Sequence, residues 1–481
     1  MATETVQAED HKLLVAGERI ETGEWDEVAS PYDGTVVGRV PLGDADLVDR
    51  AVRAAHQAFE AAEFPRHERA AVLDRAAEIV AERVDDLALT IAAEAGKPLK
   101  TAKVEATRCT DTLTFSAVEA RKFTGETVPM DATVGGAGKL GVVLRVPYGV
   151  VGAISPFNFP LNLVAHKLGP ALAAGNAVVL KPAGQTPISA LKLAAILAEA
   201  GVPDGWVNVV CGPGKEVGNA IVEHELTRAV TFTGSASVGW DIRSRIPHKK
   251  VNLELGSNAP LIVSDDGDWE TAADKAKLHA FSHAGQSCIS IQRILLHEAV
   301  ADDFTQRFVA NAEALAVGDP LDPDTDVGPL ISGGDRDRVK EWIDEAAHAG
   351  AEVLTGGELV DEDRCLAPTV IADPPTEAKV WCEEIFGPVA TVSRFSDFDQ
   401  ALEMANDSKF GLQAGVFTRD LGRGIRAGEA LEFGGVMVNE VPTFRADQQP
   451  YGGVKDSGNT REGPAYAVRE LTEPRFVTFQ A

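Results

Sequence analysis

Cys288 stands in a setting that suits nucleophilic chemistry. It lies within HAGQSCISIQR, among small and polar residues that leave access to its sulfur. A thiolate in such a place can attack a carbonyl carbon and form a covalent intermediate. The plainer alternative is a small core residue, which is the usual role of an isolated cysteine. The other cysteines (Cys109, Cys211, Cys365 and Cys382) are scattered without metal-ligand or disulfide spacing, so we expect no metal site.

An acidic residue ends the apolar segment VNLELG. Glu254 stands between Leu253 and Leu255, just before Gly256. A carboxyl group in an apolar cleft has a raised pKa, which suits a general base. The same alternation on a strand also fits a side chain that faces solvent while both leucines face the core. The segment alone leaves both interpretations open.

A rigid amide occurs in SPFNFPLNL. Asn158 lies between Pro156 and Pro160, which restrict the backbone and remove nearby donors. An amide held in this way can donate to an oxyanion, and one such donor is typically worth about 3 kcal/mol of transition-state stabilisation. The alternative is an asparagine that serves only the turn.

The segment FTGSASVG follows a predicted strand and is expected to open a helix. Its backbone N–H groups and the Ser235 hydroxyl could meet a pyrophosphate at the helix start. The spacing of Gly234 and Gly239 is a weak signal, because neither a G-x-G-x-x-G fingerprint nor a P-loop is present. A dinucleotide site at this position is therefore a hypothesis that needs support from elsewhere in the chain.

The elements that would position these residues alternate between strands and helices. Helices are predicted over 45–62, 66–94 and 101–122, which are rich in Ala, Leu, Glu and Arg, with a stop at Gly96. From Gly141 onward, the segments VVGAIS, NAVVLKP, WVNVVCG and RAVTFTG predict parallel strands joined by helices. After NAVVLKP, Thr186 is the predicted cap of the next helix. A second α/β region spans about 258–438.

Composition excludes several classes of function. The 481 residues carry 73 acidic and 45 basic side chains, a formal charge of −28. Such a surface repels nucleic acids and anionic membranes, so neither is an expected partner. It also indicates a halophile, since salt near 1 M shortens the Debye length to about 3 Å and screens the repulsion; an ordinary acidic protein is the alternative. The polar start MATETVQAED and the absence of long apolar runs predict a cytoplasmic protein.

Six segments together carry a resemblance. SPFNFPLNL, FTGSASVG, VNLELGSNAP and HAGQSCISIQR occur in this order with KPAGQTP at 181–187 and EEIFGP at 383–388. In this combination the chain resembles the aldehyde dehydrogenase superfamily over nearly its whole length. The late segment VPTFRADQQPYGGVKDSGNTREG is similar to the branch that acts on lactaldehyde, semialdehydes and related small polar aldehydes.

The resemblance implies NAD(P)-dependent oxidation of an aldehyde to a carboxylic acid without a metal. Cys288 would form a thiohemiacetal and then a thioester, and Glu254 would activate the water that hydrolyses it. Asn158 would hold the oxyanion together with the backbone N–H of Cys288. A relative that passes the acyl group to coenzyme A, or a non-catalytic binding protein on the same fold, is the alternative; the intact trio argues against both.

The resemblance also implies the cofactor contacts. Lys181 matches a position near the adenosine ribose, and Ser235 one near the pyrophosphate. Glu384 and Phe386 match residues that steady the nicotinamide ribose and ring, although core packing would also explain Phe386. The remaining matched positions are Ser155, Phe157, Gly184, Gly234 and Leu255. Many NAD-preferring relatives have Glu in place of Gly184, so the prediction is NADP or NAD, with NADP slightly favoured or both used.

Matching to the family places polar residues around the substrate. Arg108 and His166 fall where relatives acting on apolar aldehydes have apolar or aromatic side chains, and Asn162 lies on the same predicted helix as His166. Arg445 falls near the tunnel mouth. A guanidinium there would pair with an anionic group, so a small, polar, anionic aldehyde is expected. The resemblance does not separate lactaldehyde from succinate or 2-oxoglutarate semialdehyde.

Two observations limit this substrate prediction. Arg108 could instead pair only with a helix neighbour such as Glu105 or Asp111. Non-phosphorylating glyceraldehyde-3-phosphate dehydrogenases have Arg where this chain has Ser287, which disfavours that activity.

The expected architecture is α/β, an aldehyde dehydrogenase fold in three parts. A Rossmann-like NAD(P)-binding domain would comprise 1–121 and 144–255, and an α/β catalytic domain 256–454. A small β oligomerisation extension would comprise 122–143 and 455–481 and add to a neighbouring subunit's sheet, which implies a homodimer or homotetramer.

Overall fold

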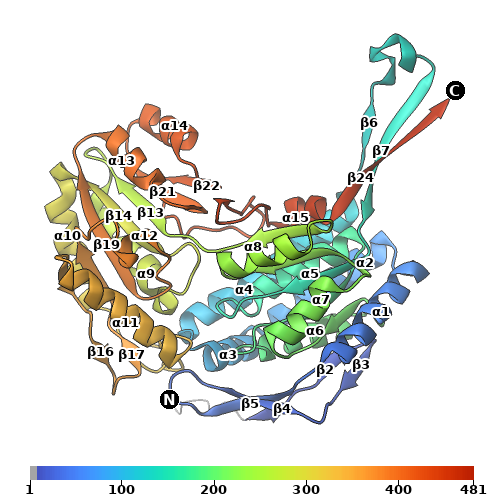
Figure 1. Cartoon of the computed structure of the whole chain (residues 1–481), viewed down its shortest axis with the longest axis horizontal. Coiled ribbons are helices and arrows are strands. Elements are labelled where there is room, and N and C mark those ends of the chain that lie inside the picture. The colour runs from blue at the N-terminus through green and yellow to red at the C-terminus, as the bar shows by residue number, and fades with distance from the viewer. Residues whose placement is uncertain (1–7, 481) are drawn as a thin grey trace.

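Two seven-stranded sheets organise the computed structural model, which describes residues 8–480 (Figure 1). The first sheet has five parallel strands followed by two antiparallel ones. Its order is β12 (Lys250–Glu254), β11 (Thr227–Thr233), β8 (Val150–Ile154), β9 (Ala177–Lys181), β10 (Val207–Val209), β2 (Leu13–Val15) and β3 (Glu18–Ile20). The parallel strands are almost wholly buried, as apolar strands covered by helices must be.

Helices cover this sheet in layers. α1 and α5 both pack on β9, and α2 and α4 pack in turn on α5. The helices of this half are α1 (Ala45–Ala61), α2 (Arg66–Glu82), α3 (Val84–Ala95), α4 (Leu99–Lys122), α5 (Asn162–Ala174), α6 (Ile188–Glu199), α7 (Asn219–Glu223), α8 (Ala236–Arg245) and α15 (Pro464–Glu470). The predicted helices are confirmed except that 66–94 is two helices, broken at Arg83.

Gly96 ends α3 as predicted. Its φ of +65° is the left-handed conformation that favours glycine, and an added Cβ would approach the rings of Pro31 and Pro329. The predicted cap of α6 is wrong, because the Thr186 hydroxyl points to the carbonyl of Phe157 instead. The carboxylate of Glu94 accepts hydrogen bonds from the first two backbone N–H groups of α6, so a side chain from α3 caps this helix.

The second sheet is parallel except for one edge. Its order is β15 (Glu352–Thr355), β18 (Thr369–Ala372), β19 (Val389–Phe395), β14 (Ile291–His297), β13 (Ala259–Val263), β21 (Gln413–Phe417) and β22 (Gly435–Val438), with β15 antiparallel. The helices of this half are α9 (Trp269–Phe281), α10 (Glu298–Glu313), α11 (Gly333–His348), α12 (Lys379–Cys382), α13 (Phe398–Asn406) and α14 (Leu421–Ala430). Its apolar core is separate from that of the first sheet, which defines a second α/β unit.

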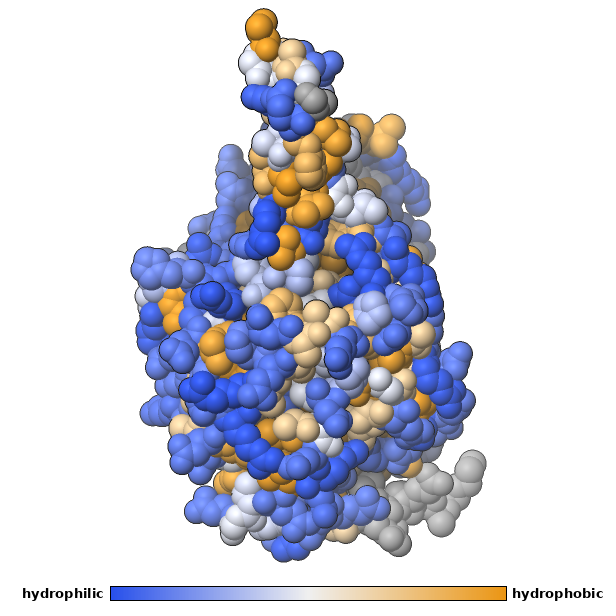
Figure 2. All heavy atoms as spheres, turned by 90° about the vertical axis from the view of Figure 1, so that its right-hand side faces the viewer, coloured by the Kyte–Doolittle hydropathy of each residue, from blue (hydrophilic) through white to orange (hydrophobic). Residues whose placement is uncertain are grey.

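A three-stranded antiparallel arm projects from the body (Figure 1). It consists of β24 (Thr472–Gln480), β7 (Lys139–Pro147) and β6 (Glu126–Val128), and β24 pairs with β7 over nine residues. Figure 2 shows apolar side chains along it, and Leu140, Leu144, Phe476 and Phe479 are each about half exposed. The predicted three-part α/β architecture with a small β extension is confirmed.

Short elements complete the chain. β1 (Glu9–Asp10), β5 (Val36–Pro41) and β4 (Trp25–Ala29) form a small sheet in which β5 runs parallel to β1 and antiparallel to β4. The others are β16 (Leu359–Val360) with β17 (Cys365–Leu366), β20 (Phe410–Gly411) with β23 (Val454–Lys455), and single helical turns η1 (Met130–Ala132), η2 (Val134–Gly136), η3 (Gly214–Gly218) and η4 (Ser282–Gly285). Within residues 8–480, no helix has both the length and the apolar character needed to cross a bilayer.

Candidate active site

A cavity of about 390 Å³ lies where the two halves of the chain meet, and Cys288 lines it. α4 contributes Arg108 and α5 contributes Asn162. The loop between β22 and β23, residues 439–453, termed the late loop, contributes Arg445 and Tyr451. The cavity thus collects side chains that are more than 300 residues apart in sequence. The predicted accessibility of Cys288 agrees with this placement.

Cys288 follows a tight turn. η4 precedes it, and His283 and Ala284 in that turn both have φ of +52°, which turns the chain sharply between α9 and β14. The Cys288 Sγ lies 2.8 Å from the hydroxyl oxygen of Tyr451. Burial raises the pKa of the Cys288 thiol, while the Tyr451 hydrogen bond and the charge of Arg445 act to lower it.

Asn158 lies on the stretch between β8 and α5 and is 3% exposed. Its Nδ2 donates to the backbone carbonyl of Gln286 at 2.9 Å, two residues before Cys288. The amide therefore serves more than its own turn, because it holds the loop that carries the thiol. A primary amide has a second N–H, so donation to a neighbouring oxygen is compatible with this bond.

Glu254 ends β12, as predicted, and is 2% exposed, so the solvent-facing interpretation is wrong. The loop at 454–458 covers it, and Gly458 bridges to its backbone. Neither carboxylate oxygen has a hydrogen-bond partner among the described residues. Burial and the charge of Glu462 raise the pKa of Glu254 well above its usual range, against the opposing charges of Arg445 and Lys167.

Glu462, Lys167 and Arg445 form a buried ionic group beside Glu254. The Arg445 Nη2 lies 3.0 Å from one Glu462 oxygen, and the Lys167 Nζ lies 3.6 Å from the other. Burial would raise the pKa of Glu462, but the two cations lower it below the usual value. The sequence reasoning missed Lys167 and Glu462. The available signal was a lysine within the largely apolar helix NLVAHKLGPALAA.

Asp447 gathers three of the predicted substrate residues. Arg108 donates to it through Nε at 3.0 Å and Nη2 at 2.8 Å. The Asn162 Nδ2 and the His166 Nε2 each lie 3.0 Å from its Oδ1. Burial raises the pKa of Asp447, but hydrogen bonds from His166 and Arg108 and the charge of Arg108 bring it well below the usual range. Asn162 and His166 are themselves buried, and His166 is absent from the cavity lining.

The alternative that Arg108 pairs with Glu105 or Asp111 is wrong, because its partner is Asp447. Glu105 instead pairs with Lys97 and accepts from the backbone N–H groups of Leu161 and Asn162. The Arg108 side chain is still 24% exposed and lines the cavity. Arg108 therefore anchors the loop that carries Asp447 and also presents a positive charge to the cavity.

The predicted cofactor residues gather at one edge of the first sheet. Ser155, Lys181, Gly234 and Leu255 lie at or just after the carboxyl ends of β8, β9, β11 and β12, which meet because the strands are parallel. Ser235 is the N-cap of α8, so the predicted strand–helix junction is confirmed. Beside this edge lies a second cavity, of about 630 Å³.

The second cavity is lined by Lys181, Lys215 and Arg245 among others. Burial lowers the pKa of Lys181. At Gly184, nearby in sequence, an added Cβ would meet nothing within 4 Å, so side chains other than glycine would fit. The residues present therefore suit a nucleotide with an anionic group.

Glu384 and Phe386 reach this region from the second half of the chain. The Glu384 Oε1 accepts from the backbone N–H of Ser257 at 2.9 Å, and burial raises the Glu384 pKa to about 7. A Cβ at Gly256 would lie 2.1 Å from the Glu384 carboxylate, so this approach requires glycine. The Phe386 ring meets Phe157 edge to face at 5.8 Å, which joins two predicted cofactor residues.

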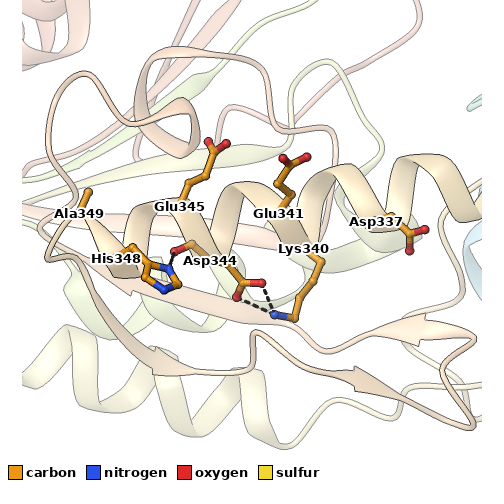
Figure 3. A pocket seen from close by; sticks show the side chains of 7 residues that line it. All are labelled: Asp337, Lys340, Glu341, Asp344, Glu345, His348 and Ala349. Carbon is orange, nitrogen blue, oxygen red and sulfur yellow. Dashed lines mark hydrogen bonds and ion pairs between the residues drawn. The ribbon is translucent and has the colours of Figure 1, made fainter.

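A larger hollow, of about 750 Å³, lies elsewhere, over the exposed face of α11 (Figure 3). Its side chains come from one helix and include Lys340, which pairs with Asp344, and His348, which bonds to the Asp344 carbonyl. All its lining residues belong to α11 or directly follow it, so the hollow lacks the convergence of several elements that the Cys288 cavity has. Among residues 8–480, no group of three or more His, Cys, Asp and Glu side chains is arranged to hold a metal ion.

The site combines a thiol that lines the cavity, an amide bonded to the loop just before that thiol, and a buried carboxyl at the edge of a doubly wound sheet. This combination fits a cysteine-dependent oxidoreductase, and comparison with known proteins agrees. Residues 20–477 match the aldehyde dehydrogenase family. A 3-sulfolactaldehyde dehydrogenase of Priestia aryabhattai is 42% identical over 475 residues, covering 99% of both chains. A lactaldehyde dehydrogenase of Methanococcus maripaludis is 39% identical over 94% of this chain and 96% of its own.

The structural comparison covers the whole fold. The crystal structure of aldehyde dehydrogenase 21 from Physcomitrella patens, in complex with the reaction product succinate, matches with a TM-score of 0.95 at 38% identity over 99% of both chains. The chain belongs to the aldehyde dehydrogenase family. It is an NAD(P)-dependent enzyme that oxidises aldehydes to acids, and the predicted family and fold are confirmed.

Proposed function

We propose that this enzyme oxidises a small, polar, anionic aldehyde through a covalent intermediate on Cys288. The observation that carries the proposal is the 390 Å³ cavity, in which the thiol faces the same space as Arg108 and Arg445. The thiol supplies the nucleophile, and the guanidinium groups supply recognition of an anionic end.

The side chains divide the chemistry among them. The Cys288 thiolate adds to the aldehyde carbon, and the resulting alkoxide accepts hydrogen bonds from the Asn158 amide and the Cys288 backbone N–H. The bound nicotinamide cofactor supplies the acceptor for the hydride that leaves this carbon. Glu254 then takes a proton from water, which attacks the thioester, releases the acid and restores the thiolate.

The buried ionic group tunes the base. Glu462 stays ionised because Lys167 and Arg445 compensate its charge, and its negative charge raises the proton affinity of Glu254. A base with a raised pKa binds the proton of an attacking water more strongly once it is ionised. Thioester hydrolysis should therefore accelerate as pH rises through the Glu254 pKa.

The charged side chains of the cavity lining support an anionic substrate. The cavity lining carries four cationic side chains, Lys97, Lys100, Arg108 and Arg445, against the two carboxylates of Glu105 and Asp326. The counter-ions of the two arginines, Asp447 and Glu462, lie outside the lining. The names of the relatives agree, since 3-sulfolactaldehyde and succinate are anionic and lactaldehyde is small and polar.

The cofactor proposal is NADP, or both NADP and NAD. Lys181, Lys215 and Arg245 line the second cavity, and Gly184 places no carboxylate near the adenosine ribose. We assign the ribose to Lys181, the pyrophosphate to Ser235, and the nicotinamide ribose and ring to Glu384 and Phe386. Ser155, Phe157, Gly234 and Leu255 would complete the site.

The arm supports an oligomer. We propose that the arm, whose strands β6 and β24 lie within the predicted segments 122–143 and 455–481, adds to the sheet of another subunit, giving a homodimer or homotetramer. The half-exposed Leu140, Leu144, Phe476 and Phe479 give the arm an apolar surface that a partner would cover. The cofactor domain would comprise 1–121 and 144–255, and the catalytic domain 256–454.

Glu254→Gln should separate the two halves of the reaction. We expect a burst of one reduced nicotinamide per site, followed by turnover slowed about 10²- to 10⁴-fold, because acylation needs no base at this position. Stopped-flow absorbance with small aldehydes, at low and high salt, measures both phases. Cys288→Ala should show neither phase; aldehyde-dependent reduction by Cys288→Ala would refute the mechanism. Full rescue of Glu254→Gln by coenzyme A would favour the acylating alternative.

Arg108→Met should lower kcat/KM for a carboxylated or sulfonated aldehyde at least tenfold more than for a neutral aldehyde of the same length. Loss of the Asp447 partner should lower the activity on both aldehydes alike. The ratio of the two kcat/KM values therefore isolates the effect of substrate charge. Arg108→Lys, which retains the charge, should lose less of this preference. An unchanged ratio in Arg108→Met would remove Arg108 from substrate recognition.

Gly184→Glu should turn the enzyme toward NAD. The added carboxylate fits without a clash and repels a 2'-phosphate, so we expect KM for NADP to rise at least tenfold and KM for NAD to change little. Gly184→Ala, which adds a side chain without charge, is the matched control. Equal effects of both variants on the two cofactors would contradict the assignment.

Phe476→Glu should weaken the oligomer. A charge in place of a large apolar side chain on the arm should cost about 2 kcal/mol or more per interface. Size-exclusion chromatography with light scattering measures the mass at micromolar concentrations. Leu421→Glu, an exposed apolar position on α14, is the control and should leave the mass unchanged. A monomeric wild type would rule out the proposed assembly.

A further inference from the structure

The hydroxyl of Tyr451 contacts the sulfur of Cys288, and the sequence reasoning gave it no role. Tyr451 is 2% exposed, and its backbone exchanges hydrogen bonds with that of Glu462. Within residues 8–480, the hydroxyl has one hydrogen-bond partner, the Cys288 Sγ at 2.8 Å. The phenol is therefore fixed by its backbone and directed at the thiol.

A guanidinium group covers the ring of Tyr451. The Arg445 Cζ lies 3.7 Å from the ring centroid, and the Arg445 Nη2 is held by Glu462 at 3.0 Å. A cation over an aromatic face is attracted to the ring and draws electron density from it, which strengthens the hydroxyl as a donor. A continuous series of contacts thus runs from the sulfur of Cys288 through Tyr451 and Arg445 to Glu462.

We propose that Tyr451 holds Cys288 in place and stabilises its thiolate by donating the phenolic hydrogen to Sγ, with Arg445 strengthening that donation. This inference rests on the proposed role of Cys288. In the thiol state, either atom can donate. When the thiol loses its proton to solvent, only the phenol retains a hydrogen to donate, so the bond becomes charge-assisted and favours the thiolate.

The neighbouring charges agree with this division. Tyr451 keeps its proton, because burial and the neighbouring Cys288 raise its pKa well above the usual range, with Arg445 opposing. At Cys288, Tyr451 and Arg445 favour the thiolate, whereas burial and the carboxyl groups of Glu384 and Glu254 oppose it. A thiol that is opposed by burial and by two carboxyl groups needs such compensation to react near neutral pH.

The test is the pH dependence of Cys288 alkylation. The full-length enzyme, without substrate, is treated with iodoacetamide, and modification of the Cys288 peptide is followed by mass spectrometry from pH 6 to 10. In Tyr451→Phe, which keeps the ring under Arg445, we expect the rate at neutral pH to fall about tenfold, because the profile moves about one pH unit higher. Tyr466→Phe, on α15 and partly exposed, is the control and should follow the wild type.

Arg445→Gln is the second variant and should move the profile in the same direction. It keeps the proposal testable if Tyr451→Phe does not fold, as judged by circular dichroism and thermal unfolding. In folded Tyr451→Phe, the deficit in kcat/KM should shrink as pH rises, whereas a purely structural defect would persist at every pH. The proposal would be overturned if the Cys288 alkylation profile of Tyr451→Phe were identical to that of the wild type. If only Arg445→Gln folds, the same outcome in that variant would overturn it.

The two proposals fail in different ways. Turnover that survives Cys288→Ala refutes the proposed reaction, whatever the alkylation profile shows. An inactive Cys288→Ala together with an unshifted Tyr451→Phe profile leaves the reaction intact and removes only Tyr451 from it.

Discussion

The buried ionic contact of Glu462 with Arg445 and Lys167 is the interaction on which the rest of the site depends. It joins α5 of the first half of the chain to the late loop that carries Tyr451. Breaking a buried pair by removing one partner typically costs about 3 to 5 kcal/mol, because an uncompensated charge remains. The same contact places a guanidinium on the ring of Tyr451, which bonds to Cys288, and an anion near Glu254, so it acts on the surroundings of both Cys288 and Glu254.

Asp447 forms a second buried ionic contact, at the wall of the cavity that carries Arg108. Its carboxylate is satisfied by Arg108 from α4 and by Asn162 and His166 from α5, so the loop is fixed to two helices at once. A loop held by two carboxylates can present side chains with the precision that covalent catalysis requires. Its irregular backbone is thus compatible with a rigid site.

The fold and the placement of the candidate catalytic residues were largely predictable, and their long-range contacts were not. Parallel strands bring their carboxyl ends together, so Glu254 and Ser235 could be placed at one edge from the order of the strands. The Asp447 contact with Arg108 spans 339 residues and the Tyr451 contact with Cys288 spans 163, and no local pattern encodes such pairs. The cap of α6 failed for the same reason, since Glu94 reaches it from another helix.

The enzyme places a cationic cavity inside an acidic molecule. With a formal charge of −28, the exterior opposes the approach of an anion, and screening by salt weakens that opposition beyond about 8 Å at physiological ionic strength. Inside the cavity, Arg108 and Arg445 are only weakly screened and are already held by Asp447 and Glu462. On the proposed function, an anionic substrate would therefore meet guanidinium groups whose orientation is already set, so little side-chain entropy would be lost on binding. Selectivity for such a substrate would then arise within the cavity, where charge and geometry act together on the group next to Cys288.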